Sequence, residues 1–131
     1  MAESVQIEAG RIGKVVYARM APNEDLLQGI EKICIAQGLR HALVRSGLGS
    51  LVDACLDLPG GARRPVTGPA VEVLSLFGEV RAQADGTLRA ELSGVVVDAA
   101  GQVVSGVLVA GANPVFATFE VTLEEWLPEA A

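Results

Sequence analysis

Aromatic side chains are scarce in this chain, which contains one Trp, one Tyr and three Phe. Half of its residues are nevertheless hydrophobic, so a core has to be built mainly from Val, Leu, Ile and Ala. β-Branched residues favour strands, and such a core is typical of a sheet-rich domain. A chain of 131 residues can bury about two thirds of its unfolded surface without disulfides or metals. We therefore expect a single domain over residues 1–131.

Long apolar runs are also missing. None approaches the roughly 18 residues that a membrane-spanning helix needs. The N-terminal stretch MAESVQIEAGR contains acids and lacks the apolar segment of a secretory signal. A cytoplasmic location without a membrane partner is therefore the default expectation. The high apolar content of so small a chain also favours a buried interface between subunits.

Cysteine, histidine and positive charge are sparse as well. Cys34 and Cys55 lie in apolar surroundings and in no CxxC motif, which favours buried free thiols over a disulfide or a nucleophile. His41 is the only histidine, so no histidine relay can form, and a surface or interface position is favoured over a catalytic role. The net charge of −6 argues against broad phosphate binding and disfavours direct DNA binding.

The first third of the chain predicts a strand followed by a helix. Residues 1–10 are polar and predict an edge strand or a frayed lead-in, and alternation over Ile12 to Met20 predicts a strand. Asn23 is the predicted N-cap of the helix, and Gly38 its predicted end. At helical spacing, five apolar residues share one face of this helix and form a stripe: Leu26, Leu27, Ile30, Ile33 and Cys34.

The middle of the chain predicts further strands. A strand region runs from His41 to Leu58 and is broken at Ser46–Ser50, where two glycines indicate a bulge or a bend of the sheet; a backbone nest lining a pocket between subunits is the alternative. Residues 59–69, rich in Gly and Pro, predict a surface loop without regular structure. Val71 to Arg81 is apolar on both faces, which predicts a central strand covered on both sides.

The stretch from Leu88 to Glu120 predicts the centre of the sheet. Two apolar runs flank a turn at residues 98–101, and a break at residues 111–114 leads into a third run. The acidic end at residues 124–131 closes the chain, with Trp126 as an anchor. The predicted fold is α+β: a mostly antiparallel sheet of seven or eight strands packed with one main helix.

Taken in order, these segments resemble the plant-and-prokaryote-conserved (PPC) domain in its prokaryotic stand-alone form, related to the domain of plant AT-hook proteins. The matching segments cover about residues 10–126 and read GRIGKVVYARMAPNEDLLQGIEKICIAQGL, SGLGSLVDACL, VEVLSLFGEV and the 88–120 stretch. The resemblance implies a homotrimeric α+β domain in a bacterial protein. It also implies a binding or regulatory module rather than an enzyme, in a family whose bacterial members are often labelled as DNA-binding.

The chain departs from the family pattern at two sites. The resemblance places three metal-binding histidines of many prokaryotic members at Arg89, Glu91 and Val107. A guanidinium or an aliphatic side chain cannot ligate zinc, so neither a metal nor another cofactor is expected. The AT-hook is also missing. Arg63 and Arg64 are only loosely similar to its core and are interpreted as solvated charge, with a nucleic-acid contact as the alternative.

The remaining candidates are charged groups on strands. Period two places Arg89 and Glu91 on one face, either as a structural ion pair or as a pair that orients a polar or anionic ligand. Glu120 matches a glutamate of the family, and a structural and a functional role remain equally open. The hypothetical ligand site is a cleft between subunits lined by Arg45, Gly47, Gly49, Arg89, Glu91 and Glu120. Its occupant would be a protein partner or a small ligand, and the competing function is a sensor or an enzyme.

Overall fold

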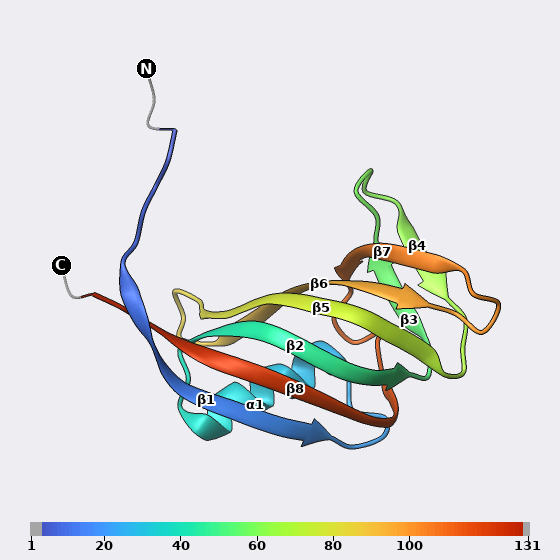
Figure 1. Cartoon of the computed structure of the whole chain (residues 1–131), viewed down its shortest axis with the longest axis horizontal. Coiled ribbons are helices and arrows are strands. Elements are labelled where there is room, and N and C mark those ends of the chain that lie inside the picture. The colour runs from blue at the N-terminus through green and yellow to red at the C-terminus, as the bar shows by residue number, and fades with distance from the viewer. Residues whose placement is uncertain (1–3, 130–131) are drawn as a thin grey trace.

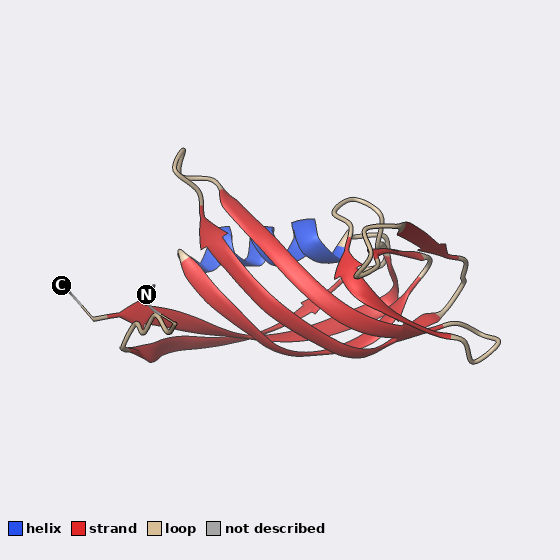
Figure 2. Ribbon diagram, turned by 90° about the horizontal axis from the view of Figure 1, so that it is seen from above, coloured by secondary structure: helices blue, strands red, loops and turns tan. Residues whose placement is uncertain are grey.

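The computed structural model describes residues 4–129. Its strands, along which buried and exposed residues alternate, form one curved sheet with a helix on the concave face (Figures 1 and 2). The elements are β1 Gly10–Met20, α1 Leu26–Gln37, β2 His41–Leu51, β3 Ala54–Asp57, β4 Arg63–Val66, β5 Val71–Ala82, β6 Leu88–Val97, β7 Val103–Leu108 and β8 Val115–Pro128. The eight strands lie in the order β1-β8-β2-β5-β6-β7-β3-β4, and neighbouring strands are antiparallel. The predicted fold class is confirmed.

Helix α1 buries the predicted stripe against the sheet, with Leu26, Ile30 and Cys34 fully buried. Its N-cap is Asp25, whose carboxylate accepts a hydrogen bond from the Gln28 N–H at 3.0 Å. The prediction of Asn23 as N-cap is wrong. Asn23 adopts a left-handed conformation, with φ 70°, and its N–H donates to the Val115 carbonyl at 2.7 Å. Both residue types can cap a helix, and pairing with β8 decides between them.

Glycines fix both the end and the packing of α1. Gly38 closes the helix in the left-handed conformation, as predicted. Gly29 lies inside the helix, where a Cβ atom would overlap the Met20 side chain of β1. The cost of a helical glycine, about 1 kcal/mol relative to alanine, is therefore offset by the close approach of the helix to the sheet.

Of the predictions for the middle of the chain, one is confirmed in part and one is wrong. The bulge predicted at Ser46–Ser50 is confirmed, because the register of β2 against β8 shifts between Val44 and Ser46 and again between Gly49 and Leu51. The strand does not break there, since β2 continues to Leu51 and the chain turns at residues 52–53. Residues 59–69 are not without regular structure, because β4 forms a hairpin with β3 in which Asp57 pairs with Arg63. The polar sequence of β4 concealed this strand, since it lies at the exposed edge of the sheet.

Strand β5 is covered on one face only. Val73, Leu76 and Val80 are buried under the helix side, whereas Leu74 and Phe77 are 60% and 54% exposed. The prediction that this strand is covered on both faces is therefore wrong for one chain. Figure 2 shows the reason, which is that the helix covers only the concave face of the sheet. We call the opposite face, which carries Leu48, Leu74 and Phe77, the open face.

The start of β1 and the end of β8 lie at the same end of the sheet, where the Glu129 N–H donates to the Ala9 carbonyl at 2.9 Å, and residues 4–8 extend away from there (Figure 1). Residues 4–9 form no strand, and the part of the predicted edge strand at residues 1–3 lies outside the described residues. Trp126 belongs to β8 and pairs opposite Ile12, while residues 130–131 of the acidic end also lie outside them. Cys34 and Cys55 are both free, the first buried and the second half-buried. Among residues 4–129, no helix has the length and apolarity needed to cross a bilayer.

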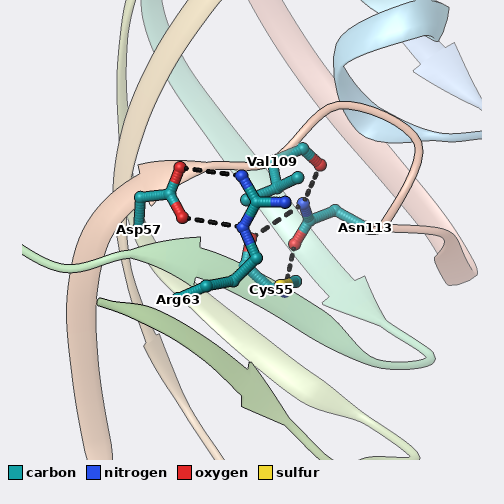
Figure 3. A network of polar contacts seen from close by, with 5 residues as sticks. All are labelled: Cys55, Asp57, Arg63, Val109 and Asn113. Carbon is teal, nitrogen blue, oxygen red and sulfur yellow. Dashed lines mark hydrogen bonds and ion pairs between the residues drawn. The ribbon is translucent and has the colours of Figure 1, made fainter. Parts of the chain in front are cut away.

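Asn113 is a fully buried polar residue that joins three parts of the fold (Figure 3). Its side-chain oxygen accepts the Cys55 N–H of β3 at 2.9 Å, and its amide nitrogen donates to the carbonyls of Cys55 and Val109 at 3.2 and 2.8 Å. Its backbone N–H donates to the N-cap carboxylate of Asp25 at 3.0 Å. Asn113 therefore links β3 and the end of β7 through its side-chain amide, whose polar atoms are all paired, and α1 through its backbone N–H.

We expect Asn113→Ala to lower the free energy of unfolding by about 3 kcal/mol, because it leaves a buried N–H and carbonyls without their partners. Urea unfolding followed by circular dichroism measures the change. Gln83→Ala, in an exposed turn, is the control and should change stability by less than about 0.5 kcal/mol. Equal losses for the two variants would contradict a structural role for the Asn113 network.

Candidate functional site

A pocket of about 420 Å³ lies at an uncovered edge of β6. Strand β7 pairs with β6 only from Ser93 to Val97, so the first half of β6 lacks a neighbour on that side. The carboxylate of Glu31 on α1 accepts the Ala90 N–H there at 2.8 Å. One unpaired strand amide is thereby satisfied, and the helix forms one wall of the pocket.

The pocket brings together all three positions that the resemblance assigned to metal ligands. Arg89, Glu91 and Val107 line it, together with Glu31, Asp57 and Arg63. Among residues 4–129, no three side chains of His, Cys, Asp or Glu are grouped so that they could hold a metal ion. The donor set at this pocket therefore consists of guanidinium and carboxylate groups, which recognise polar or charged ligands by hydrogen bonds.

The two charge pairs of the pocket differ in strength. Arg63 binds Asp57 through two hydrogen bonds of 2.9 and 3.2 Å (Figure 3). This contact lowers the pKa of the Asp57 carboxyl. Arg89 and Glu91 lie 3.8 Å apart, with their side chains 65% and 71% exposed. An exposed pair at that distance contributes little to stability, so both groups are free to turn towards a ligand.

Glu120 lies elsewhere on the sheet. It belongs to β8, and β2 and β5 separate that strand from β6. Its carboxylate accepts hydrogen bonds from the Tyr17 hydroxyl and from Arg19, the latter at 3.3 Å. The hydrogen bond to Glu120 is also the main reason why the pKa of Tyr17 is raised. Within one chain, Glu120 thus links β8 to β1 through these hydrogen bonds and does not line the pocket.

The predicted residues of β2 do not line the pocket either. Arg45 forms an ion pair with Glu124 at 3.0 Å. Gly47 and Gly49 lie against the buried ring of Phe119, where a Cβ atom would overlap it. The geometry is that of a bulged strand beside a core aromatic. The six predicted residues therefore form no single cleft within one chain, and a cleft between subunits stays a prediction.

The other charged candidates are engaged by neighbours. His41 is half-buried, and its Nε2 lies 3.1 Å from a Glu79 carboxylate oxygen. Arg64 donates to the side-chain oxygen of Gln102 at 3.3 Å. Sequence reasoning missed Glu31 and the Asp57–Arg63 pair. The only available signal for that pair was the Pro-Gly-Gly turn between the two residues, which is typical of a hairpin.

The Asp57–Arg63 contact predicts a pH response. A carboxyl with a lowered pKa in the folded protein stabilises it above the usual pKa, and this contribution is lost as the pH falls through the lowered value. We expect Asp57 to titrate below its usual 3.8 and Arg63→Ala to move it back towards that value, as measured by carbon-detected NMR. Asp85, whose pKa is lowered mainly by its hydrogen bond with Thr87, is the control and should not move. Titration of Asp57 at its usual pKa in the unchanged protein would show that the pair does not form.

The family model of the Plants and Prokaryotes Conserved (PCC) domain matches residues 7–127. A search of curated proteins found no match. Among solved structures, a plant- and prokaryote-conserved (PPC) protein from Pyrococcus horikoshii is 25% identical with a TM-score of 0.77, and the match covers 98% of this chain and 87% of that one.

Two further structures share the fold at lower identity. A metal-containing protein from Archaeoglobus fulgidus is 24% identical with a TM-score of 0.79, and the match covers 96% of this chain and 89% of that one. A candidate DNA-binding protein from Ralstonia eutropha JMP134 is 20% identical with a TM-score of 0.68, over 86% of this chain and 78% of that one. Because the family model covers nearly the whole chain, this protein belongs to the PCC (or PPC) domain family.

Proposed function

We propose that this protein is a non-enzymatic binding or regulatory module of the bacterial cytoplasm that works as a homotrimer. The observation that carries the proposal is the apolar character of the open face. Its exposed side chains include Tyr17, Leu48, Leu74, Phe77, Val107 and Phe116. These residues come from β1, β2, β5, β7 and β8, so the apolar surface extends across the sheet rather than lying at one spot.

An exposed apolar surface of this extent is unusual for a monomer. Burying it against other copies of the chain would contribute about 25 cal/mol for each Å² removed from water. The opposite, helix-covered face already forms the core, so the open face is the surface left for assembly. The predicted cleft between subunits would in addition require β6 of one subunit to lie near β2 and β8 of another.

Direct DNA binding is not part of the proposal. The name of the Ralstonia protein associates its fold with DNA, but this chain carries a net charge of −6. Arg63 and Arg64, the two adjacent arginines, are held by Asp57 and Gln102. A protein that binds duplex DNA needs clustered basic groups that are free to contact phosphates. A link to transcription would therefore run through a protein partner.

A second candidate function is that of a small-molecule or anion sensor at the β6 pocket. The observation in its favour is that Arg89 and Glu91 line a pocket of about 420 Å³ while remaining only weakly paired. The volume lies in the range of small-molecule sites. A guanidinium and a carboxylate side by side would favour a ligand that carries both a negative group and a hydrogen-bond donor.

Assembly through the open face predicts that Phe77→Glu separates the subunits, because it buries a charge in an apolar interface. Light scattering should give three times the 13.5 kDa chain mass for the unchanged protein and a smaller mass for the variant. Ile35→Glu is the matched control, since Ile35 is 66% exposed on the helix, and it should leave the mass unchanged. A monomer at micromolar concentration before any substitution would overturn the proposal.

The sensor hypothesis predicts that phosphate, sulfate or a small amino acid raises the melting temperature of the unchanged protein, and that Arg89→Ala or Glu91→Gln abolishes the rise. Differential scanning fluorimetry at constant ionic strength measures it. Arg11→Ala, an exposed arginine on β1, is the control and should keep the response. If the two variants lower stability while every probe response is retained, the pair is structural and the sensor function fails.

A further inference from the structure

A second pocket, of about 410 Å³, lies at one end of the sheet and shares no residue with the β6 pocket. It is formed where β2 begins and where β5 and β8 end, beside the C-terminus of α1. Arg40, His41, Arg81, Glu125 and Trp126 line it, and Leu127 and Pro128 add apolar surface. We call it the end pocket.

Some charged side chains at the end pocket are held by ion pairs or hydrogen bonds within the described chain, and one is not. Glu79 lies 3.1 Å from His41 and 2.6 Å from Arg81, and so holds both side chains. Glu125 accepts the backbone N–H of Lys14 at 2.9 Å. Among residues 4–129, no side chain forms an ion pair or hydrogen bond with the Arg40 guanidinium. The end pocket therefore contains one arginine, Arg40, that is not held by an acidic side chain of the described residues.

Trp126 supplies a second donor at the same pocket. Its indole N–H donates to a carboxylate oxygen of Glu8 at 2.7 Å. Glu8 belongs to the exposed segment that precedes β1, which leads away from this end of the sheet (Figure 1). The charge of Glu8 also adds to the raised pKa of Arg81, after the larger effect of Glu79. A carboxylate of the chain itself therefore already binds the indole N–H of a residue that lines the pocket.

We propose that the end pocket binds a small organic carboxylate, which takes the indole N–H of Trp126 in place of Glu8 and pairs with Arg40. The exchange is favourable because one carboxylate replaces another on the same donor and an ion pair with a guanidinium is gained. The indole face, Leu127 and Pro128 provide a surface for an apolar ring or chain on the ligand. Glu8 then acts as a built-in competitor, so occupancy would release the segment before β1. The site does not depend on the proposed trimer or on the β6 pocket.

The experiment uses the full chain and its only tryptophan. Trp126 fluorescence is followed while cyclohexanecarboxylate is added at constant ionic strength, with acetate, inorganic phosphate and the uncharged cyclohexanemethanol as parallel probes. We expect a saturable change with cyclohexanecarboxylate and a weaker response to acetate, because acetate lacks the ring. Phosphate tests whether any anion suffices, and an equal response to it overturns the assignment of a carboxylate site. An equal response to the alcohol would show apolar adsorption without charge recognition and would likewise overturn it.

Three variants test the residues. Glu8→Ala should tighten binding several-fold, because the internal competitor is gone, and Arg40→Ala should weaken it about tenfold, the usual effect of losing a charge-assisted hydrogen bond. Glu72→Ala removes an exposed carboxylate at the start of β5, away from the pocket, and should bind like the unchanged protein. Circular dichroism confirms that each variant is folded. Affinities that are unchanged in Arg40→Ala, or unchanged or weaker in Glu8→Ala, would overturn the proposal.

Discussion

The side-chain and backbone hydrogen bonds of the buried residue Asn113 hold the helix, the end of β7 and the start of β3 in one arrangement. A buried amide is costly unless all of its polar atoms are paired, so the arrangement is fixed as a unit. Cys55, which it binds, stands two residues before Asp57, and Val109 directly follows the end of β7 (Figure 3). Asp57 and Val109 both line the β6 pocket. The geometry of the candidate site therefore depends on a residue that does not line it.

Local sequence patterns were sufficient to predict an element where one of its faces is buried. The apolar stripe from Leu26 to Cys34 predicted the helix, and the alternation of apolar residues predicted β1, because both periods arise directly from burial of one face. The patterns failed where tertiary contacts decide. Asn23 and Asp25 are both good caps, and tertiary contacts select the second, because Asn23 pairs with β8 and Asp25 accepts the Asn113 N–H. Strand β4 shows no alternation of apolar and polar residues, because it lies at the solvent-exposed edge of the sheet. It is a strand because it pairs with β3.

The candidate site was only partly predictable for a similar reason. The resemblance pointed to Arg89, Glu91 and Val107, and the structure places them around one pocket. Glu31 and Arg63 could not be found in this way, since their places depend on how the helix and the β3–β4 hairpin fold over the sheet. Apolar residues on both faces of β5 favour cover on both faces, but Leu74 and Phe77 are exposed in one chain. Their exposure is the physical argument for the proposed assembly.

The β6 pocket and the open face are physically connected. Glu31 and Leu27 reach the pocket from the helix side, whereas Arg89 and Glu91 have their side chains exposed on the uncovered strand edge. Val107 lines the pocket and is also part of the exposed apolar surface. A ligand in the pocket would therefore contact a residue of the open face, which is the proposed subunit interface. A ligand that binds the assembled form more tightly than the single chain also stabilises assembly. The free energy gained is the same in both directions. If the open face is the subunit interface, as proposed, Val107 is the residue through which occupancy of the pocket and subunit association would be coupled.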